Sequence, residues 1–291
     1  MYEIYLNEYI NNRMRIFTTL IIIFFTSFAN AEETLSDKLS GYVYNLIPGE
    51  GTTEVSIDIR ENYKPDYSIL LVRELARDEN SNIFSQMSLF NTEKLNDERI
   101  VANLGIGKRM LSDNNNLMTG YNIFFDADED GNVRSSLGGE IKNAVLGFNT
   151  NYYAGLQDAN GETVLDGYDL KLNSQIPYLY WAKAFVSNYK WEGVDRDDIE
   201  GMKVGTNMQL SPTVSLEAAY DDKDKSGLED EYYFNLMFNF PPQSGPTMQD
   251  GIGSTAWKEE KDMSGELLTK IQRNNKIVVE FKGSSTISRT D

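Results

Sequence analysis

Apolar and polar residues alternate along much of the chain between residues 53 and 240. The segment 231–240, EYYFNLMFNF, shows the pattern most clearly, and its apolar phase consists of Tyr232, Phe234, Leu236, Phe238 and Phe240. Residues that alternate in this way point to opposite faces of a β-strand. In a soluble sheet the apolar face would pack on a core, whereas in a membrane barrel it would face lipid and the polar face would line a lumen.

Similar alternation recurs between turn signals and predicts twelve strands of about ten residues each, the length that a tilted strand needs to cross a bilayer. We expect them near residues 53–60, 66–75, 82–91, 98–108, 117–126, 133–142, 143–154, 166–176, 180–189, 201–211, 213–221 and 230–240. An open sheet edge cannot persist in lipid, so the strands should close on themselves. The predicted fold is all-β, a twelve-stranded antiparallel transmembrane β-barrel.

The connections between these strands favour a membrane barrel over a soluble secreted β-sandwich, which is the alternative fold. One set is short, such as Tyr178-Leu179 and Ser211-Pro212, whereas the complementary set is longer and acidic, as at 91–97, 126–132 and 155–167. Short periplasmic turns and longer outside loops are typical of bacterial outer-membrane barrels. Aromatic residues near the strand ends would form an interfacial girdle. We therefore expect the chain in the bacterial outer membrane, with lipid as a partner.

The composition argues against an enzyme. The chain contains no histidine and no cysteine, which removes the usual general base, the serine–histidine pair of hydrolases and thiolate metal sites. The run DADEDG at 126–131 matches the opening of a calcium loop, but Leu137 stands where a bidentate glutamate is required. A net charge of −18 disfavours nucleic acid as a partner. We expect no catalytic, cofactor-binding or metal-binding residues, and no cofactor.

The first 31 residues predict a cleavable signal peptide. Two arginines precede an apolar run over residues 16–25, and Ala29-Asn30-Ala31 has the form of a cleavage site. A membrane anchor is the alternative, but the run is too short to span ~30 Å of hydrocarbon. Residues 1–13 carry glutamates where basic residues are usual, so Met14 is an alternative start. We expect residues 32–52 to form a periplasmic lead-in, with periplasmic chaperones and the barrel assembly machinery as partners.

Six charged residues fall on the polar phase and are expected to point into the lumen: Asp58, Arg60, Glu140, Lys171, Lys203 and Glu217. We favour a paired network that keeps charge away from lipid over an ion-selectivity filter. Glycine-rich runs also occur, LGIGKR at 104–109 and LGGE at 137–140. No helix follows them to hold a phosphate, so we interpret these glycines as space for a chain that threads the lumen.

One predicted strand carries the pattern N-x-G-x-G-x-R, at Asn103, Gly105, Gly107 and Arg109. Together with the motifs that follow it in the same order, this strand resembles the inverse autotransporter barrel of intimin and invasin. Its next two strands are matched by GYNIFFD at 120–126 and by Gly138 and Glu140, with Ser136 at the place of a first glycine. DGYDLKLNSQIPYL at 166–179 is similar to a later strand, and LLTKIQRNNKIVVEFK at 267–282 resembles the family's helix and extended segment. The resemblance spans roughly residues 53–282.

This resemblance implies an outer-membrane barrel whose N-terminus lies in the periplasm and whose lumen is threaded by a linker that exports a C-terminal adhesin. We expect the barrel at 53–240 and a lumen-threading helix and linker at 241–291, with residues 262–282 in the lumen. Leu267, Leu268 and Ile271 share a helical face, whereas Ile277, Val279 and Phe281 alternate as in an extended strand. A short periplasmic appendage is the alternative for this tail.

We expect an inverse-autotransporter barrel that anchors and exports an adhesin-type passenger, here without a passenger or a peptidoglycan-binding module. The alternative function is a passenger-less outer-membrane channel or scaffold. A host or surface receptor is expected as a partner only where a passenger exists.

Overall fold

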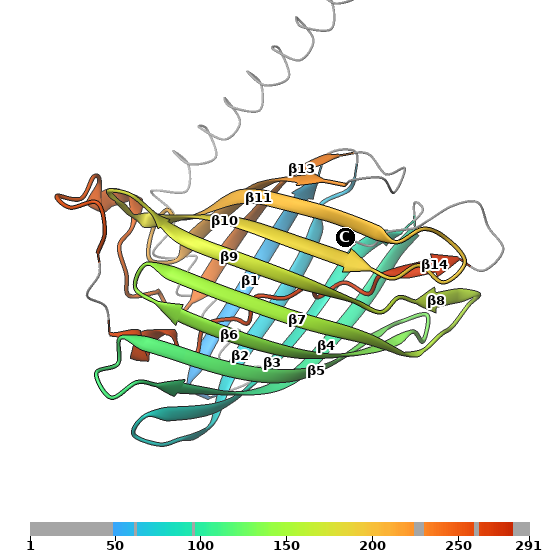
Figure 1. The fold of residues 1–291 in the computed structure, drawn as a ribbon, viewed down its shortest axis with the longest axis horizontal. Coiled ribbons are helices and arrows are strands. Elements are labelled where there is room, and N and C mark those ends of the chain that lie inside the picture. Colours follow the sequence, from blue (N-terminus) through green and yellow to red (C-terminus); the bar gives the residue numbers. More distant parts are fainter. Residues whose placement is uncertain (1–48, 61–62, 95–96, 224–229, 259–261, 282–291) are drawn as a thin grey trace, which may run out of the picture. The chain divides into compact units, whose positions relative to one another are not determined.

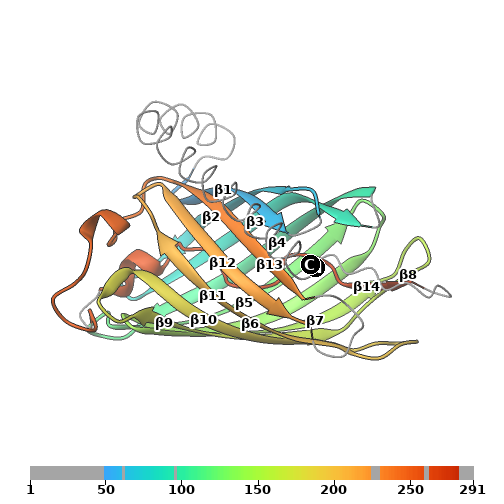
Figure 2. The same cartoon turned by 90° about the horizontal axis from the view of Figure 1, so that it is seen from above.

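Twelve β-strands close into one antiparallel barrel in the computed structural model (Figures 1 and 2). The structure describes residues 49–60, 63–94, 97–223, 230–258 and 262–281. The predicted signal peptide (1–31) and most of the predicted lead-in (32–52) lie outside these residues. Within them, no helix is long and apolar enough to cross a membrane.

All twelve predicted strands occur, most of them extended by a few residues at one or both ends. They are β1 (Gly51–Arg60), β2 (Asp66–Arg77), β3 (Ser81–Lys94), β4 (Asp97–Leu111), β5 (Leu117–Asp128), β6 (Val133–Asn143), β7 (Leu146–Gln157), β9 (Gly167–Ile176), β10 (Leu179–Trp191), β11 (Ile199–Gln209), β12 (Val214–Asp222) and β13 (Glu231–Phe240). Each strand pairs with its neighbours in sequence, apart from the short β8 (Glu162–Val164), and β1 pairs with β13 to close the barrel. The predicted twelve-stranded barrel is confirmed.

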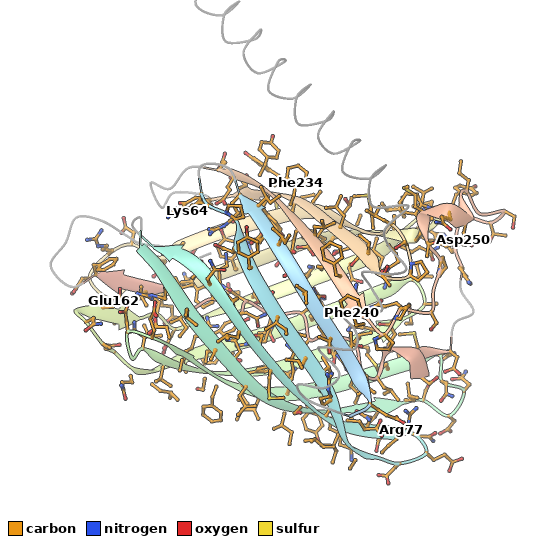
Figure 3. The ribbon with its side chains drawn as sticks, turned by 180° about the vertical axis from the view of Figure 1, so that it is seen from behind. Lys64, Arg77, Glu162, Phe234, Phe240 and Asp250 are labelled. Atoms are coloured by element: carbon orange, nitrogen blue, oxygen red, sulfur yellow. The ribbon has the colours of Figure 1, made fainter. Side chains whose placement is uncertain are left out.

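The strand register keeps the apolar phases of neighbouring strands on one face of the wall. Across β4 to β9, the paired residues Ile106, Ile123, Leu137, Tyr152 and Tyr168 are all exposed. At the closure, Ile57 pairs with Leu236 and Val55 with Phe238. A one-residue slip would turn these apolar side chains into the lumen, so the alternation fixes the register. Figure 3 shows side chains projecting outward all around the barrel.

The two ends of the barrel differ in their connections. We call the end formed by residues 78–80, 112–116, 144–145, 177–178 and 210–213 the turn end. The opposite end, where β1 is followed by β2, β3 by β4, β5 by β6, β7 by β9, β10 by β11 and β12 by β13, is the loop end, and its described connecting residues are 63–65, 129–132, 158–166, 192–198, 223 and 230. In Figure 3, Lys64 and Glu162 mark the loop end, whereas Arg77 and Asp250 mark the turn end.

Strands extend into two of the predicted long loops, 91–97 and 126–132. The β3–β4 pairing continues to Lys94 and Asp97, and β5 continues to Asp128. The prediction was wrong here because it equated acidic residues with loops. Strand pairing depends on backbone hydrogen bonds, and it continues past the hydrocarbon wherever water or a partner can satisfy the charged side chains.

After β13 the chain folds under the turn end and then enters the barrel. Residues 241–258, with the 3₁₀ turn η1 (Met248–Asp250), bond to the β9–β10 turn, where Tyr178 N–H donates to the Ala256 carbonyl at 2.9 Å. A second 3₁₀ turn, η2 (Met263–Glu266), follows beside the β4–β5 turn, and Met263 N–H donates to the Asn115 carbonyl at 2.8 Å. Figures 1 and 2 show the segment running from there through the barrel to β14 (Val279–Phe281).

The predicted helix in this segment is wrong: between residues 262 and 281 the structure has the 3₁₀ turn η2, a turn at 267–268, bends at 269, 273 and 276 and the short strand β14, but no α-helix. Length gives the physical reason. Residues 270–281 cover most of the distance between the two ends, and twelve residues span roughly 40 Å when extended but only about 18 Å as an α-helix. A hydrocarbon core of about 30 Å therefore requires the extended form.

Candidate functional site

The candidate site is the lumen of the barrel, which residues 262–281 thread from the turn end to the loop end. Buried side chains of the wall bind this segment mainly through its backbone, in three groups described in order from the turn end.

At the turn end, Arg109 of β4 binds the exit of η2. Its guanidinium is fully buried and donates to the carbonyls of Glu266, Leu267 and Thr269 at 3.1, 2.9 and 2.7 Å. The Nε of the same group donates to Glu140 at 2.6 Å. The Glu266 carbonyl also accepts from Thr269 N–H at 3.2 Å, and the arginine adds a donor to all three carbonyls where the 3₁₀ turn ends.

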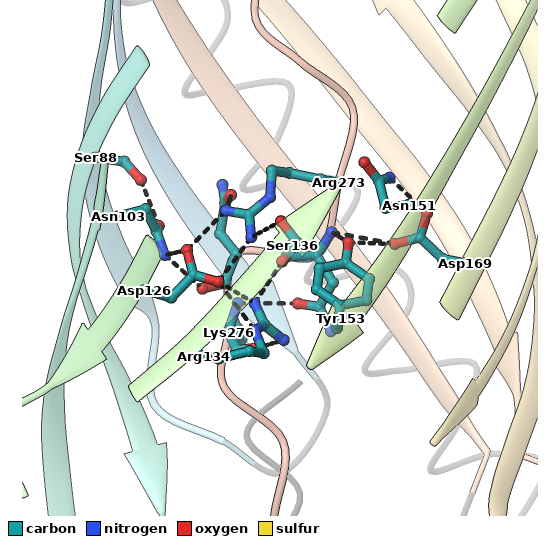
Figure 4. Close-up of polar contacts among 12 residues, drawn as sticks. Ser88, Asn103, Asp126, Arg134, Ser136, Asn151, Tyr153, Asp169, Arg273 and Lys276 are labelled. Carbon is teal, nitrogen blue, oxygen red and sulfur yellow. Dashed lines mark hydrogen bonds and ion pairs between the residues drawn. The ribbon is translucent and has the colours of Figure 1, made fainter. Parts of the chain in front are cut away.

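In the middle of the lumen, Asp126 of β5 lies between two arginines (Figure 4). Arg134 of β6 approaches it to 2.8 Å and Arg273 of the threaded segment to 2.7 Å, and all three side chains are fully buried. Arg134 also donates to the carbonyls of Asn274 and Lys276, both at 2.8 Å. The carboxylate compensates the buried charge, while the remaining guanidinium donors bind the threaded backbone.

Polar side chains of the wall bind further backbone groups near this point. Asn103 donates to the Asn275 carbonyl and Asn151 to the Gln272 carbonyl, both at 3.0 Å. In the other direction, Ile271 N–H donates to Gln86 and Asn274 N–H to the Tyr153 hydroxyl, both at 2.7 Å. Backbone groups are present in every sequence, so this mode of binding depends little on the side chains of the threaded chain.

Glycines support these arginines indirectly. A Cβ at Gly107 would clash with the ring of Phe84, and one at Gly105 would clash with the ring of Phe124. Arg109 stacks on Phe84 at 4.6 Å and Arg273 stacks on Phe124 at 4.2 Å. The glycines make room for aromatic rings that lie under the arginines, rather than directly for the threaded chain as we predicted.

At the loop end, the threaded segment forms a two-stranded sheet. β14 pairs antiparallel with β8, and Val279 lies opposite Val164. Ile277 and Val279 are buried in an apolar cluster with residues of β3, β4 and β8. The carboxylate of Glu280, also buried, accepts from the backbone N–H groups of Val194 and Asp195, both at 3.0 Å. The chain is therefore fixed at this end by strand pairing, apolar packing and one buried acid.

A carboxylate cluster beside β8 contains Asp128, Asp130 and Glu162, close enough together to hold a metal ion. The Arg99 guanidinium instead contacts all three, at 2.8, 2.7 and 2.8 Å. The buried Arg99 side chain thus occupies the place of a metal ion in the cluster. Its ion pairs connect β4 to β5 and β8.

Neighbouring groups lower the pKa values of acids outside the spanning strands, among them Asp262 and Asp198. The backbone N–H of Ser264, 2.9 Å away, lowers the pKa of Asp262, which caps η2. The Lys190 side chain, followed by the Gly193 N–H, lowers the pKa of Asp198 in the β10–β11 connection. Both carboxylates are therefore ionised at neutral pH and stabilise the rims of the barrel through hydrogen bonds.

The threaded segment does not fill the lumen. A cavity of about 270 Å³ remains between residues 270–276 and the wall. It is lined from the side of β1 to β3 and β9 to β13, whereas the β4–β6 wall packs directly on the segment. The segment therefore lies to one side of the lumen, and polar space remains beside it.

The six charged residues expected in the lumen all form ion pairs. Asp58 lies 3.6 Å from Lys276, Arg60 2.8 Å from Asp66, and Glu140 2.6 Å from Arg109. Lys171 lies 3.5 Å from Glu217, and Lys203 lies 3.5 Å from Asp221. All except Glu140 line the cavity.

The apolar residues of the last strand lie on the opposite face of the wall. Tyr232 is exposed, whereas Phe234, Leu236 and Phe238 are half-buried and Phe240 is buried.

Sequence reasoning missed several residues that bind the threaded segment, including Arg134, Asp126, Lys270, Arg273, Lys276 and Glu280. Asp126 was placed both at the end of the predicted strand 117–126 and at the start of the acidic loop 126–132, and its position on the inward phase of Gly120, Asn122 and Phe124 was not used. That phase was the signal that could have found it. The charges of the segment carry no such signal, because their partners lie far away in the sequence.

Comparison with known proteins agrees with this geometry. A family model described as the inverse autotransporter β-domain matches residues 26–275. The chain belongs to the inverse autotransporter family. The resemblance found in the motifs is thereby confirmed, and family and fold together support an outer-membrane location.

Relatives of this inverse autotransporter include intimin of Escherichia coli O111:H-, 27% identical over 210 residues that cover 66% of the chain and 22% of the relative. Intimin of Citrobacter freundii is 25% identical over 256 residues, which cover 82% of the chain and 26% of the relative. The chain thus spans about a quarter of the length of these relatives.

A solved structure described as "Unveiling the Mechanism Behind the in-meso Crystallization of Membrane Proteins" matches with a TM-score of 0.64 at 21% identity. The match covers 80% of this chain and 99% of that structure. At this identity the match shows a shared barrel fold.

Proposed function

We propose that this barrel anchors and exports a polypeptide attached to its C-terminus, of the adhesin type that the resemblance to intimin implies. The observation that carries the proposal is the path of residues 262–281 from the turn end to the loop end. A chain held in the lumen by its backbone is a chain that has entered at one end and can continue beyond the other.

The proposed orientation puts the turn end in the periplasm and the loop end outside the cell. Short turns on one side and longer acidic connections on the other support it. The proposed partners are outer-membrane lipid, periplasmic chaperones and the barrel assembly machinery, supported by the exposed apolar wall and the aromatic last strand. A host or surface receptor becomes a partner only through a passenger.

For the charged residues of the lumen we propose a paired network rather than a selectivity filter. The ion pairs of Lys171 with Glu217 and of Lys203 with Asp221 support this role. Charges that neutralise each other inside the wall need not be exposed to lipid.

A passenger-less channel or scaffold is the second candidate, and the cavity of about 270 Å³ beside the segment is the observation that favours it. The two candidates differ in what becomes of a domain that is attached after residue 291.

The test is to fuse one immunoglobulin-like domain with an epitope after residue 291 and to label intact cells with an antibody. A translocating barrel displays the epitope, whereas a channel or scaffold leaves it inside. A matched epitope inserted at Asn114, in the β4–β5 turn, reports the turn end and should bind antibody only after permeabilisation. An internal C-terminal epitope on a barrel that shows heat-modifiable migration would overturn the proposal.

A further inference from the structure

The threaded segment combines contacts that tolerate sliding with contacts that do not. The carbonyl-directed donors Arg109, Arg134, Asn103 and Asn151 would find a carbonyl at any position of an extended chain. The apolar face of β14 is also tolerant, because Ile277, Val279 and Phe281 repeat with period two. A slip by two residues in either direction would bring Ile277 or Phe281, both apolar, opposite Val164 in place of Val279.

The charged residues of the segment are different. Lys270 lies 2.7 Å from Glu54, Arg273 2.7 Å from Asp126, and Lys276 2.9 Å from Asp66. These wall residues belong to β1, β5 and β2, so the three cations bind separate parts of the wall. Glu280 completes the set at the loop end with the N–H groups of Val194 and Asp195.

No slip by two residues preserves these contacts. A shift in one direction replaces the three cations with Gln272, Asn275 and Val278. A shift in the other direction replaces them with Leu268, Ile271 and Asn274. Each acid would lose the cation that the segment supplies. Asp126 would keep Arg134 and Asp66 would keep Arg60 on the wall, but the fully buried Arg273 would lose its carboxylate, which is costly.

The surroundings of Val278 add a second penalty. Val278 is buried in an apolar cluster with Tyr153, Leu165, Tyr189, Trp191 and Ile199. Lys276 and Glu280 stand two residues to either side of it, so a slip by two would bring a charge into this cluster. The charges therefore determine the register twice, through the pairs they form and through the cluster that excludes them.

We infer that Lys270, Arg273, Lys276 and Glu280 form a charge code that sets the register at which the threaded chain comes to rest, while the backbone contacts hold a chain in any register. The inference deepens the proposed function and rests on it, because a stopping point matters for a chain that slides. The register itself can be measured without a passenger.

Engineered cysteines report this register. The chain contains no native cysteine. Leu165 N–H donates to the Val278 carbonyl, so Val164 and its partner Val279 form a non-hydrogen-bonded pair, whose Cα atoms typically lie about 4.5 Å apart and within the range of a disulfide. Val164→Cys should cross-link to Val279→Cys under oxidation, and much less to Ile277→Cys or Phe281→Cys, which lie diagonally at about 7–8 Å.

The decisive variant inserts two serines after Thr269, between η2 and Lys270. If the charges set the register, residue 279 in native numbering stays opposite residue 164. The two inserted serines then form a longer connection between η2 and Lys270 at the turn end. If Leu267 and η2 set the register instead, the cross-link moves to position 277, and that result would overturn the inference.

A second variant replaces Lys270, Arg273, Lys276 and Glu280 with glutamine. We expect loss of the single register, with cross-links shared among positions 277, 279 and 281. Lys258→Gln, an exposed lysine of the same C-terminal segment, is the matched control and should keep the cross-link at 279. An unchanged cross-link in the fourfold variant would also overturn the inference. Both cross-linking assays are run on assembled barrels and do not depend on export. Loss of the inferred register would therefore not disprove export, and failure of export would still allow the register to be measured.

Discussion

At the scale of single residues, arginine is used where the wall must bind both a carboxylate and a main chain. Arg109 contacts Glu140 and three carbonyls, and Arg134 contacts Asp126 and two carbonyls. The planar guanidinium carries five donors and stays charged when buried, whereas lysine offers three donors around one point. The carboxylate compensates the charge, and the spare donors remain for the threaded chain.

Arg109→Gln should therefore destabilise the assembled barrel. The substitution leaves Glu140 with Lys142 as its ion-pair partner and removes the donor to three carbonyls, so we expect a loss of roughly 3–5 kcal/mol in the free energy of unfolding. Arg109→Lys should give an intermediate loss of stability, because lysine keeps the positive charge but lacks the planar guanidinium that binds a carboxylate and carbonyls together. Urea-induced unfolding in lipid vesicles, followed by tryptophan fluorescence, measures both.

Lys108→Gln is the control for this prediction. Lys108 is next to Arg109 on the outward phase of β4, and its replacement should change stability by no more than about 0.5 kcal/mol. Equal losses at positions 108 and 109 would contradict the role given to the buried arginine.

The lumen could be predicted from the sequence only in part, and single residues show why. The inward phase of Glu140 and Lys171 follows from strand alternation, a local pattern. The partner of Asp126, Arg273, lies 147 residues away, and no local pattern connects the two. The predicted role of Gly105 failed for the same reason, because its neighbour Phe124 comes from another strand.

At the scale of elements, the strands were predictable because successive residues of a barrel strand point alternately to lipid and to the lumen. Val186 and Ser187, neighbours in β10, illustrate it: Val186 is exposed on the outside, and Ser187 lines the cavity. The threaded segment obeys no such rule. Its helical spacing at Leu267, Leu268 and Ile271 predicted a helix, but the span to be covered and the donors on the wall favoured extended backbone.

The same pair of residues tests the two faces of the wall. Val186→Arg places a charge against lipid near the middle of β10 and should hinder insertion by ~2–4 kcal/mol. Ser187→Arg points into a polar cavity with unused space and should cost less. Folding yield in lipid vesicles, read from heat-modifiable migration, compares them, and equal yields would show that the face assignment is wrong.

At the scale of the whole molecule, barrel and threaded segment form one closed object with an uneven charge distribution. The wall residues that line the cavity include more acids than bases. The acids are Glu54, Asp58, Asp66, Asp169, Glu217, Asp221 and Glu231, and the bases are Arg60, Lys171 and Lys203. Lys270, Arg273 and Lys276 of the segment offset part of this difference, so the segment both occupies the lumen and reduces its negative potential.

Removing residues 262–291 should therefore open a cation-selective pore. The deletion enlarges the cavity along the path of the segment and removes three cations that face the acidic wall, so potassium should carry more current than chloride in planar bilayers. Deleting only residues 283–291 leaves every described residue in place and should leave the barrel as closed as the full chain. An unchanged conductance in the longer deletion, on barrels that still show heat-modifiable migration, would mean that the strands of the wall close the lumen by themselves. Anion preference would contradict the charge balance assigned to the wall.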